Sequence, residues 1–176
     1  SFAYDIEGSI YGKYLVESKP NAKIGVLYQN DDVGKSYMRG FRKALGAKQS
    51  NIVKEVSQEM SDPTVDSQIL QLQASGAEVL VAFTSNKAQA QAIRKAAAIG
   101  WKPFYIVPYV SSSISGVLTP AGLDNSVGLV SSYWFKTPSD PTWNNDKAMQ
   151  EYLAFFKKYL PNDDPGDTTS VYTYMG

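Results

Sequence analysis

The chain has 176 residues and contains neither cysteine nor histidine. The usual zinc sites, cysteine nucleophiles and histidine-based catalytic triads depend on these residues, so the sequence excludes all three. The lack of cysteine does not identify a compartment, because proteins without disulfides occur in oxidising as well as reducing surroundings.

An excess of charge and long apolar segments are also missing. Lysine plus arginine number 17, and so do aspartate plus glutamate, which makes the formal net charge at pH 7 zero. This balance indicates no basic surface for nucleic acid and no polybasic membrane anchor. No apolar run approaches the roughly 20 residues that span a bilayer.

Short apolar segments are present instead, and 43% of the residues are hydrophobic, enough for one well-packed domain. Four of these segments are nearly continuous rather than alternating, which is typical of strands covered on both faces of a parallel sheet. They are residues 23–29, 78–84, 104–108 and 126–133. Residues 51–59 alternate more and predict a strand at the edge of the sheet.

Helical patterns separate the strands and occupy residues 4–18, 33–46, 64–76 and 86–100. In the first of them, Ile6, Ile10, Tyr11 and Tyr14 lie along one face. The strict alternation of helices and strands predicts an α/β fold with a doubly wound, mainly parallel sheet flanked by helices.

The turn after the first strand resembles part of a phosphate-binding loop. Residues 34–36 are Gly-Lys-Ser, the end of the pattern G-x-x-x-x-G-K-[ST], but Gln29 holds the place of the first glycine. Asp31 and Asp32 would also repel a phosphate. We therefore predict a strand-to-helix turn in which Asp31 or Asp32 caps the helix.

In an open parallel sheet, ligands bind outside the carboxyl ends of the strands. Residues 29–33, 84–86 and 108–111 follow predicted strands there, and each segment leads to a helix N-terminus with free backbone donors. The alternative is that Ser85, Asn86 and Ser111 only cap helices. The candidate ligand-binding residues are Asp32, Val33, Thr84, Ser85, Asn86, Tyr109 and Ser111.

An enzyme is not expected, and neither is a cofactor or a metal. Only Asp31 and Asp32 offer carboxylates at the predicted rim, and neighbouring side chains usually diverge. Residues 111–116 lack the G-x-S-x-G pattern of a nucleophile elbow, and residues 161–170 lack the ligand spacing of a calcium loop. Four glutamates lie on helices, on the edge strand or before strands, away from the rim: Glu7, Glu55, Glu59 and Glu78.

Residues 136–176 differ from the rest of the chain. A proline-broken connector leads to a helix at about 146–160, whose apolar face is unusually wide. We expect residues 136–176 to be displaced, disordered or docked on another copy of the chain. Because the chain starts without methionine and ends as a new element begins, we expect it to be a piece of a longer protein.

Two long stretches carry a resemblance to a known family. AKIGVLYQNDDVGKSYMRGFRKALG (22–46) and SDPTVDSQILQLQASGAEVLVAFTSNKAQAQAIRKAAAIGWKPFYI (61–106) resemble the second lobe of type I periplasmic binding proteins. The nearest relatives are the branched-chain amino acid binding proteins of ABC transporters. Members of that family have two similar α/β lobes joined by three crossovers, with the ligand held between the lobes.

The resemblance implies a division of the chain. Residues 1–135 would form the second, C-terminal, ligand-binding lobe, and residues 136–176 the crossover and return segment belonging to the first lobe. The implied partners are a small-molecule ligand, the membrane permease of an ABC transporter and the missing first lobe, with no nucleic acid. The implied location is periplasmic or extracellular.

The function implied is that of an extracytoplasmic solute-binding component of an ABC importer. It would capture a small organic ligand, either an amino acid or a carboxylic or aromatic acid, in the cleft between the lobes. A ligand-sensing extracellular domain of a receptor is an alternative with the same fold. A flavodoxin-like enzyme domain is a further alternative, but it needs a cofactor or an activated nucleophile at the rim.

Two positions depart from the family pattern. The family turn D-x-x-Y/F-G has an aromatic residue where this chain has Val33, which widens the pocket. The acidic residue that accepts the ammonium of an amino acid is replaced by Tyr109, which is neutral at pH 7. Since burying an ammonium without a counter-charge is unfavourable, we expect an aromatic or aliphatic carboxylic acid, unless Asp31 or Asp32 supplies the charge.

Overall fold

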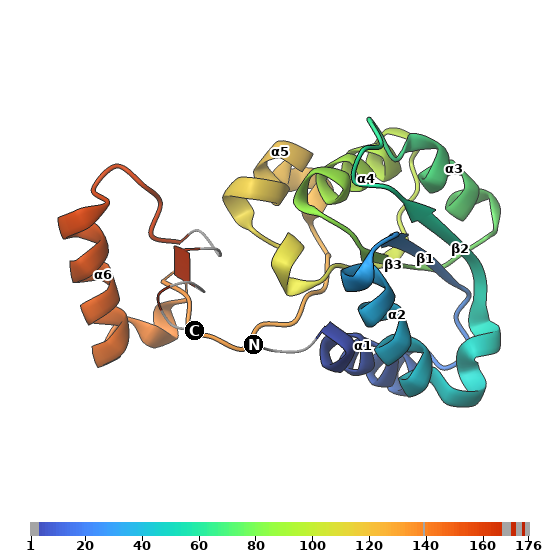
Figure 1. Ribbon diagram of the computed structural model, residues 1–176, viewed down its shortest axis with the longest axis horizontal. Coiled ribbons are helices and arrows are strands. Elements are labelled where there is room, and N and C mark those ends of the chain that lie inside the picture. Colours follow the sequence, from blue (N-terminus) through green and yellow to red (C-terminus); the bar gives the residue numbers. More distant parts are fainter. Residues whose placement is uncertain (1–3, 139, 167–169, 172–173, 175–176) are drawn as a thin grey trace.

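The computed structural model describes residues 4–138, 140–166, 170–171 and 174. Within this part of the chain, a four-stranded sheet lies between two pairs of helices (Figure 1). The longer elements are α1 (Tyr4–Ser18), β1 (Ile24–Gln29), α2 (Asp32–Leu45), β2 (Ile52–Gln58), α3 (Asp66–Ala74), β3 (Val79–Phe83), α4 (Asn86–Ala98), β4 (Phe104–Ile106) and α6 (Lys147–Tyr159). Short helical turns follow β4, among them η2 (Tyr109–Ser111), the π-helical turn η3 (Ile114–Leu118) and α5 (Thr119–Ala121).

The sheet is parallel throughout, with the strand order β2-β1-β3-β4. The predicted α/β class is therefore confirmed, and β2 is the edge strand that its alternating pattern predicted. The chain first adds β2 next to one edge of β1 and then crosses over to add β3 next to the other edge of β1. The winding direction therefore reverses between β1 and β3. At such a reversal the loops after the two strands separate and leave a crevice.

Alternate residues of the central strand β3 fill two separate cores. Val79, Val81 and Phe83 pack beneath α1 and α2. Leu80 and Ala82 pack on the opposite face, beneath α3 and α4. Both faces of the strand are thus buried, which explains why its sequence is apolar at every position.

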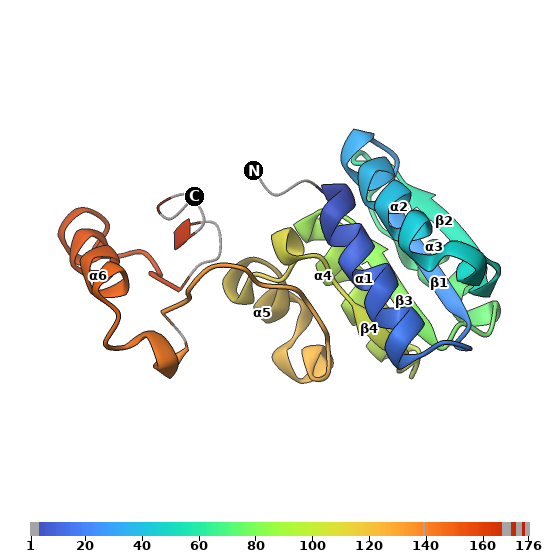
Figure 2. The same ribbon diagram turned by 90° about the horizontal axis from the view of Figure 1, so that it is seen from below.

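Helices α1 and α2 pack closely against each other on one face of the sheet (Figure 2). A Cβ atom on Gly40 would lie 1.8 Å from the Asp5 carbonyl oxygen, and one on Gly8 would lie 2.3 Å from the Tyr37 carbonyl oxygen. The buried face of α1 therefore includes its glycines, whereas Ile6, Ile10 and Tyr14 are exposed. The apolar face predicted from the sequence was wrong in this respect, because glycine allows close backbone contact that hydrophobicity does not reveal.

The strand predicted at residues 126–133 is also absent from the described structure. Val130 forms a single parallel bridge with Ile106, and Val127 is 83% exposed. Gly128 has a φ of 87°, in the left-handed region, and this turn prevents strand pairing from starting earlier in the segment. The segment instead leaves the sheet after two backbone hydrogen bonds at Val130.

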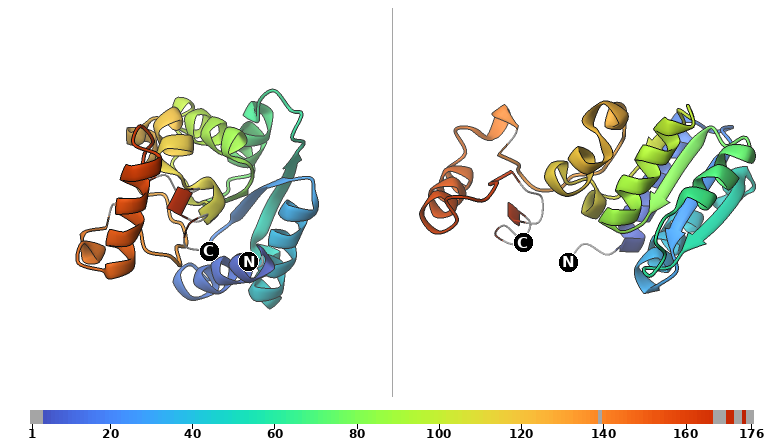
Figure 3. Two further views of the ribbon diagram at one scale, coloured as in Figure 1. Left: turned by 60° about the vertical axis from the view of Figure 1, so that its left-hand side comes forward. Right: turned by 90° about the horizontal axis from the view of Figure 1, so that it is seen from above.

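Helix α6 stands apart from the sheet and its flanking helices (Figures 1 and 2, and the right-hand view of Figure 3). Met149, Tyr152 and Phe156 form a small core of their own with Val171, against which Phe135 and Trp143 pack. Four large apolar side chains of the helix and its end are exposed: Leu153, Phe155, Tyr159 and Leu160. The helix is displaced, as one of the outcomes expected from its wide apolar face.

Candidate functional site

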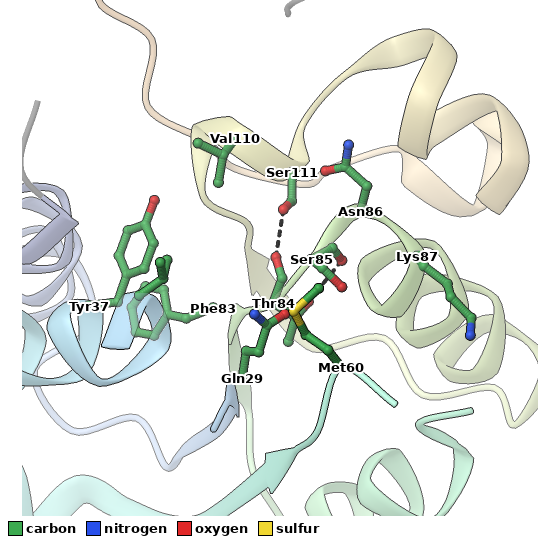
Figure 4. A pocket seen from close by; sticks show the side chains of 11 residues that line it. Gln29, Tyr37, Met60, Phe83, Thr84, Ser85, Asn86, Lys87, Val110 and Ser111 are labelled. Atoms are coloured by element: carbon green, nitrogen blue, oxygen red, sulfur yellow. Dashed lines mark hydrogen bonds between the residues drawn. The ribbon is translucent and has the colours of Figure 1, made fainter. Parts of the chain in front are cut away.

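A pocket of about 490 Å³ opens at the carboxyl ends of β1 and β3, where the winding direction reverses. Side chains from the loops after β1, β2, β3 and β4 contribute to it (Figure 4). Its lining consists of Gln29, Val33, Tyr37, Met60, Phe83, Thr84, Ser85, Asn86, Lys87, Val110 and Ser111. The volume lies within the range of ligand sites for small organic molecules.

The β1 side of the pocket is fixed by a tight strand-to-helix turn. Asp31 caps α2, because its Oδ1 accepts a hydrogen bond of 2.9 Å from the Gly34 amide, and its Oδ2 accepts one from the Gln29 side chain. A Cβ atom on Gly34 would lie 2.0 Å from the Gln29 carbonyl oxygen. The glycine in the phosphate-loop lookalike thus serves close packing of the helix on the strand, and the predicted cap is confirmed.

The β3 side is held by hydrogen bonds from two neighbouring elements. The Ser111 hydroxyl donates to the Thr84 carbonyl over 2.6 Å, which joins η2 to the end of β3 (Figure 4). The Thr84 hydroxyl donates to the Gln89 side chain of α4, which in turn donates to the Tyr105 hydroxyl over 2.7 Å. Burial raises the pKa of Tyr105 above its ordinary range, so this hydroxyl is neutral. A fixed network of neutral groups therefore supports this wall.

One wall of the pocket is aromatic. The rings of Tyr37 and Phe83 are stacked with centroids 4.7 Å apart and planes 7° apart. Val33 lies one helical turn before Tyr37 on α2, and Met60 follows the edge strand β2. This wall suits the apolar body of a ligand.

The charge in the lining is positive. Lys87 is the single ionisable residue with a charge at pH 7 among the described lining residues, and no carboxylate is among them. Lys87 and Asn86 stand in the first turn of α4, where the Ser85 side chain makes no capping hydrogen bond. The first amides of a helix attract negative charge. This end of the pocket suits an anionic group.

The structure gathers most, but not all, of the residues predicted for the site. Val33, Thr84, Ser85, Asn86 and Ser111 line the pocket. Asp32 and Tyr109 do not: Asp32 is exposed in the first turn of α2, and Tyr109 is buried. The Tyr109 ring packs edge-on against Trp134, with centroids 3.7 Å apart, and also contacts Phe135. Whether any of these residues binds a ligand stays a prediction.

Several lining residues were missed by the sequence analysis. Tyr37 lies in the second turn of α2, Lys87 lies in the first turn of α4, and Met60 follows the edge strand. One signal was available, since Tyr37 is four residues after Val33 and therefore shares its helix face. Nothing in the sequence marked Met60.

Glu7 was placed away from the rim by the sequence analysis, and this was wrong. It is fully buried, and its Oε1 accepts a 2.8 Å hydrogen bond from the Tyr109 amide. Tyr37 and Tyr11 each donate a 2.6 Å hydrogen bond to it. Burial, followed by the charge of Glu7, raises the pKa of both tyrosines above the ordinary range. The carboxylate therefore sits directly behind the pocket wall.

Within the described residues, neither a candidate metal site nor a candidate membrane span is found. The described residues include no group of three or more aspartate or glutamate side chains placed to hold a metal ion. In the same part of the chain, no helix has the length and apolar character needed to cross a membrane.

A parallel α/β sheet with a ligand-sized pocket at its switch point defines a class of small-molecule binding folds. The family model of periplasmic binding proteins matches residues 1–176, and the chain belongs to this family. Its members and the structures described next are solute-binding proteins, not enzymes. No curated protein matches the chain in a sequence comparison.

Solved structures share the fold. A substrate-binding periplasmic protein from Ralstonia solanacearum matches with a TM-score of 0.83 and 21% identity, over 97% of this chain and 47% of that one. A solute-binding protein of an ABC transporter from R. palustris in complex with benzoate matches with a TM-score of 0.80 and 19% identity, over 99% of this chain and 46% of that one. A branched-chain amino acid ABC transporter from Thermus thermophilus with bound valine matches with a TM-score of 0.80 and 16% identity, over 98% of this chain and 44% of that one. The chain thus spans less than half the length of these proteins.

Proposed function

We propose that this chain is the ligand-binding lobe of the extracytoplasmic solute-binding component of an ABC importer. The observation that supports this most directly is the pocket at the switch point of the sheet, on a chain that belongs to the periplasmic binding protein family. The ligand is a small organic molecule held between this lobe and a second one. The permease of the transporter receives it, and the protein works in the periplasm or outside the cell.

The ligand that suits the lining is a carboxylic acid with an aromatic or aliphatic body. Its carboxylate faces the start of α4, where Lys87 makes the lining positive and the Ser85 side chain makes no capping hydrogen bond to the first amides. Its body lies along Tyr37 and Phe83. An α-amino acid would place an ammonium in a lining with no carboxylate among its described residues, and burial without a counter-charge is unfavourable.

In this proposal, the C-terminal segment of the chain leads out of the ligand-binding lobe and back into the first lobe. Residues 136–176 are the crossover and the first part of the return into the other lobe. The separate small core of α6 and its exposed apolar side chains support this assignment, because they need a further surface to cover them. The first lobe of the same protein is the expected cover.

Calorimetric titration of the complete protein tests the ligand class. We expect benzoate or a fatty acid to bind in preference to leucine and valine. Replacing the cation, Lys87→Met, should weaken binding of the acid roughly tenfold, the effect of about 1.4 kcal/mol of lost charge interaction. Lys43→Met, an exposed position on α2 outside the pocket lining, is the matched control and should bind as the wild type does. Sub-micromolar binding of leucine with none of the acids would overturn the assignment.

A further inference from the structure

The first turn of α1 contains a carboxylate that the pocket lining does not include. Glu7 has none of its surface exposed, and no lysine or arginine pairs with it within the described chain. A buried carboxylate without a cation is unfavourable unless hydrogen-bond donors surround it. Its surroundings must therefore provide several donors.

Four neutral donors do so, and each comes from a different part of the chain. Oε2 accepts from the Tyr37 hydroxyl of α2 over 2.6 Å. Oε1 accepts from the Tyr11 hydroxyl over 2.6 Å, from the Tyr109 amide over 2.8 Å and from the Ser132 hydroxyl over 2.8 Å. Glu7 thus joins α1, α2, the loop after β4 and the segment that leaves the sheet.

One of these partners lines the pocket, one begins a turn that contributes to the pocket, and one lies in the segment that leaves the sheet. Tyr37 is part of the aromatic wall, and Tyr109 begins the η2 turn that supplies Val110 and Ser111. Ser132 follows Val130, the last residue bridged to the sheet, and its amide donates to the Tyr11 hydroxyl over 3.0 Å. A change in the position of one partner must therefore be transmitted to the others or break a hydrogen bond to the carboxylate.

We propose that Glu7 is a positioning residue that couples the ligand pocket to the segment through which the chain leaves the sheet. It holds the Tyr37 wall and the η2 turn in the geometry that fits the ligand, and it ties that geometry to the exit segment at Ser132. This inference rests on the proposed function, since it assigns Glu7 a role in binding an organic acid at that pocket. A neutral side chain of the same shape at position 7 should therefore weaken binding of the acid, although residue 7 does not line the pocket.

The test compares the variants Glu7→Gln and Tyr37→Phe, singly and combined, in the complete protein. A glutamine has one acceptor oxygen, and its amide nitrogen can only donate, so at least one hydrogen bond to position 7 is lost. Each single variant should weaken acid binding roughly tenfold, mostly through faster dissociation. The double variant should lose little more than either single one, because both remove the same interaction. Glu17→Gln, an exposed position on the same helix, is the matched control.

A role limited to stability gives a different result. In that case the variants unfold at lower urea concentration, but the folded protein binds the acid with the wild-type affinity and dissociation rate, and the proposal is wrong. Additive effects of Glu7→Gln and Tyr37→Phe on affinity would also contradict it. Both variants are conservative in shape, so the comparison does not depend on a cavity-forming substitution that prevents folding.

Amide hydrogen exchange separates failure of this inference from failure of the proposed function. If the wild type binds none of the acids, the proposed ligand class is wrong, whereas the coupling can still be measured without ligand. Glu7→Gln should then speed exchange at the Tyr109 and Ser132 amides relative to Glu17→Gln, with global stability measured in parallel. Unchanged exchange at both amides would overturn the coupling.

Discussion

At the scale of single residues, the turn after β1 contains two adjacent aspartates, and only the first of them supports the pocket rim. Asp31 serves both purposes, since it caps α2 and accepts a hydrogen bond from Gln29, which lines the pocket. Its neighbour Asp32 is exposed in the first turn and does not line the pocket. Two adjacent aspartates therefore have different structural roles.

Replacing Asp31 should destabilise the protein more than replacing Asp32. Asp31→Ala removes the capping bond to the Gly34 amide, and we expect the free energy of unfolding to fall by about 1 kcal/mol. Asp32→Ala keeps the cap and removes only a charge near the helix N-terminus, worth about 0.3–1 kcal/mol. Urea unfolding of both variants measures the difference. Equal losses would show that the cap contributes nothing beyond its charge.

At the scale of elements, close approach of α1 and α2 is the feature that positions Glu7. The helices touch at Gly8 and Gly40 with no room for a methyl group. The first turn of α1 therefore lies deep enough for its carboxylate to reach the loop after β4.

Gly40→Ala should separate these helices. Although alanine favours helix over glycine by about 1 kcal/mol, its Cβ would overlap the Asp5 carbonyl oxygen, and overpacking of this kind costs typically 1–3 kcal/mol. We expect a net loss of stability in urea unfolding and faster exchange of the Tyr109 amide. Arg39→Ala, the exposed neighbour on the same helix, should show neither effect. A stabilised Gly40→Ala variant would contradict the tight contact.

Helix α6 provides a prediction about pH. The Lys136 side chain and the Met149 amide bind the Asp146 carboxylate and hold its pKa below the ordinary value. A lowered pKa in the folded state means that the stabilisation is fully present above the unfolded value of about 3.9 and is lost as pH falls through the lower, folded value. In an NMR pH titration, the chemical shift of the Met149 amide should therefore change with a midpoint below about pH 3.9. Asp146→Asn should abolish this transition while still capping the helix.

The sequence predicted the elements that repeat a simple pattern and missed those set by local geometry. The apolar runs of β1 and β3 predicted buried strands correctly, because both faces of these strands are covered. The run around Val130 was also predicted as a strand, yet the turn at Gly128 interrupts it and a single bridge forms at Val130. Glu7 could not be recognised as a rim residue, because its position depends on how closely two glycine-bearing helices pack. Hydrophobic periodicity contains no information about that distance.

At the scale of the whole molecule, the described chain consists of a well-packed sheet domain and a small, separate helical cluster. The cluster around α6 has its own core of Met149, Tyr152 and Phe156. It is joined to the sheet domain through residues 131–138, and Trp134 and Phe135 of this connection contact Tyr109.

Removing the cluster should leave the sheet domain folded. A chain of residues 1–135 should unfold with a midpoint temperature within about 4 °C of the 176-residue chain, a shift that corresponds to roughly 1 kcal/mol. The shorter chain should also self-associate less in analytical ultracentrifugation, because the exposed apolar residues of α6 are gone. Loss of cooperative unfolding in the shorter chain would show that residues 136–176 belong to the same folding unit.

The separation between the sheet core and the rim has a consequence for evolution. The two cores are formed by the strands and the buried faces of the helices, whereas most of the side chains that line the pocket lie in the loops and helix starts after the strands; Tyr37 and Phe83 belong to both. Substitutions of exposed rim side chains such as Met60 therefore change the pocket without disturbing either core. A lineage can explore new ligands one loop at a time on an unchanged scaffold. Glu7 and its partners mark the part of the rim where such drift is constrained, because a change there must be matched in three other segments.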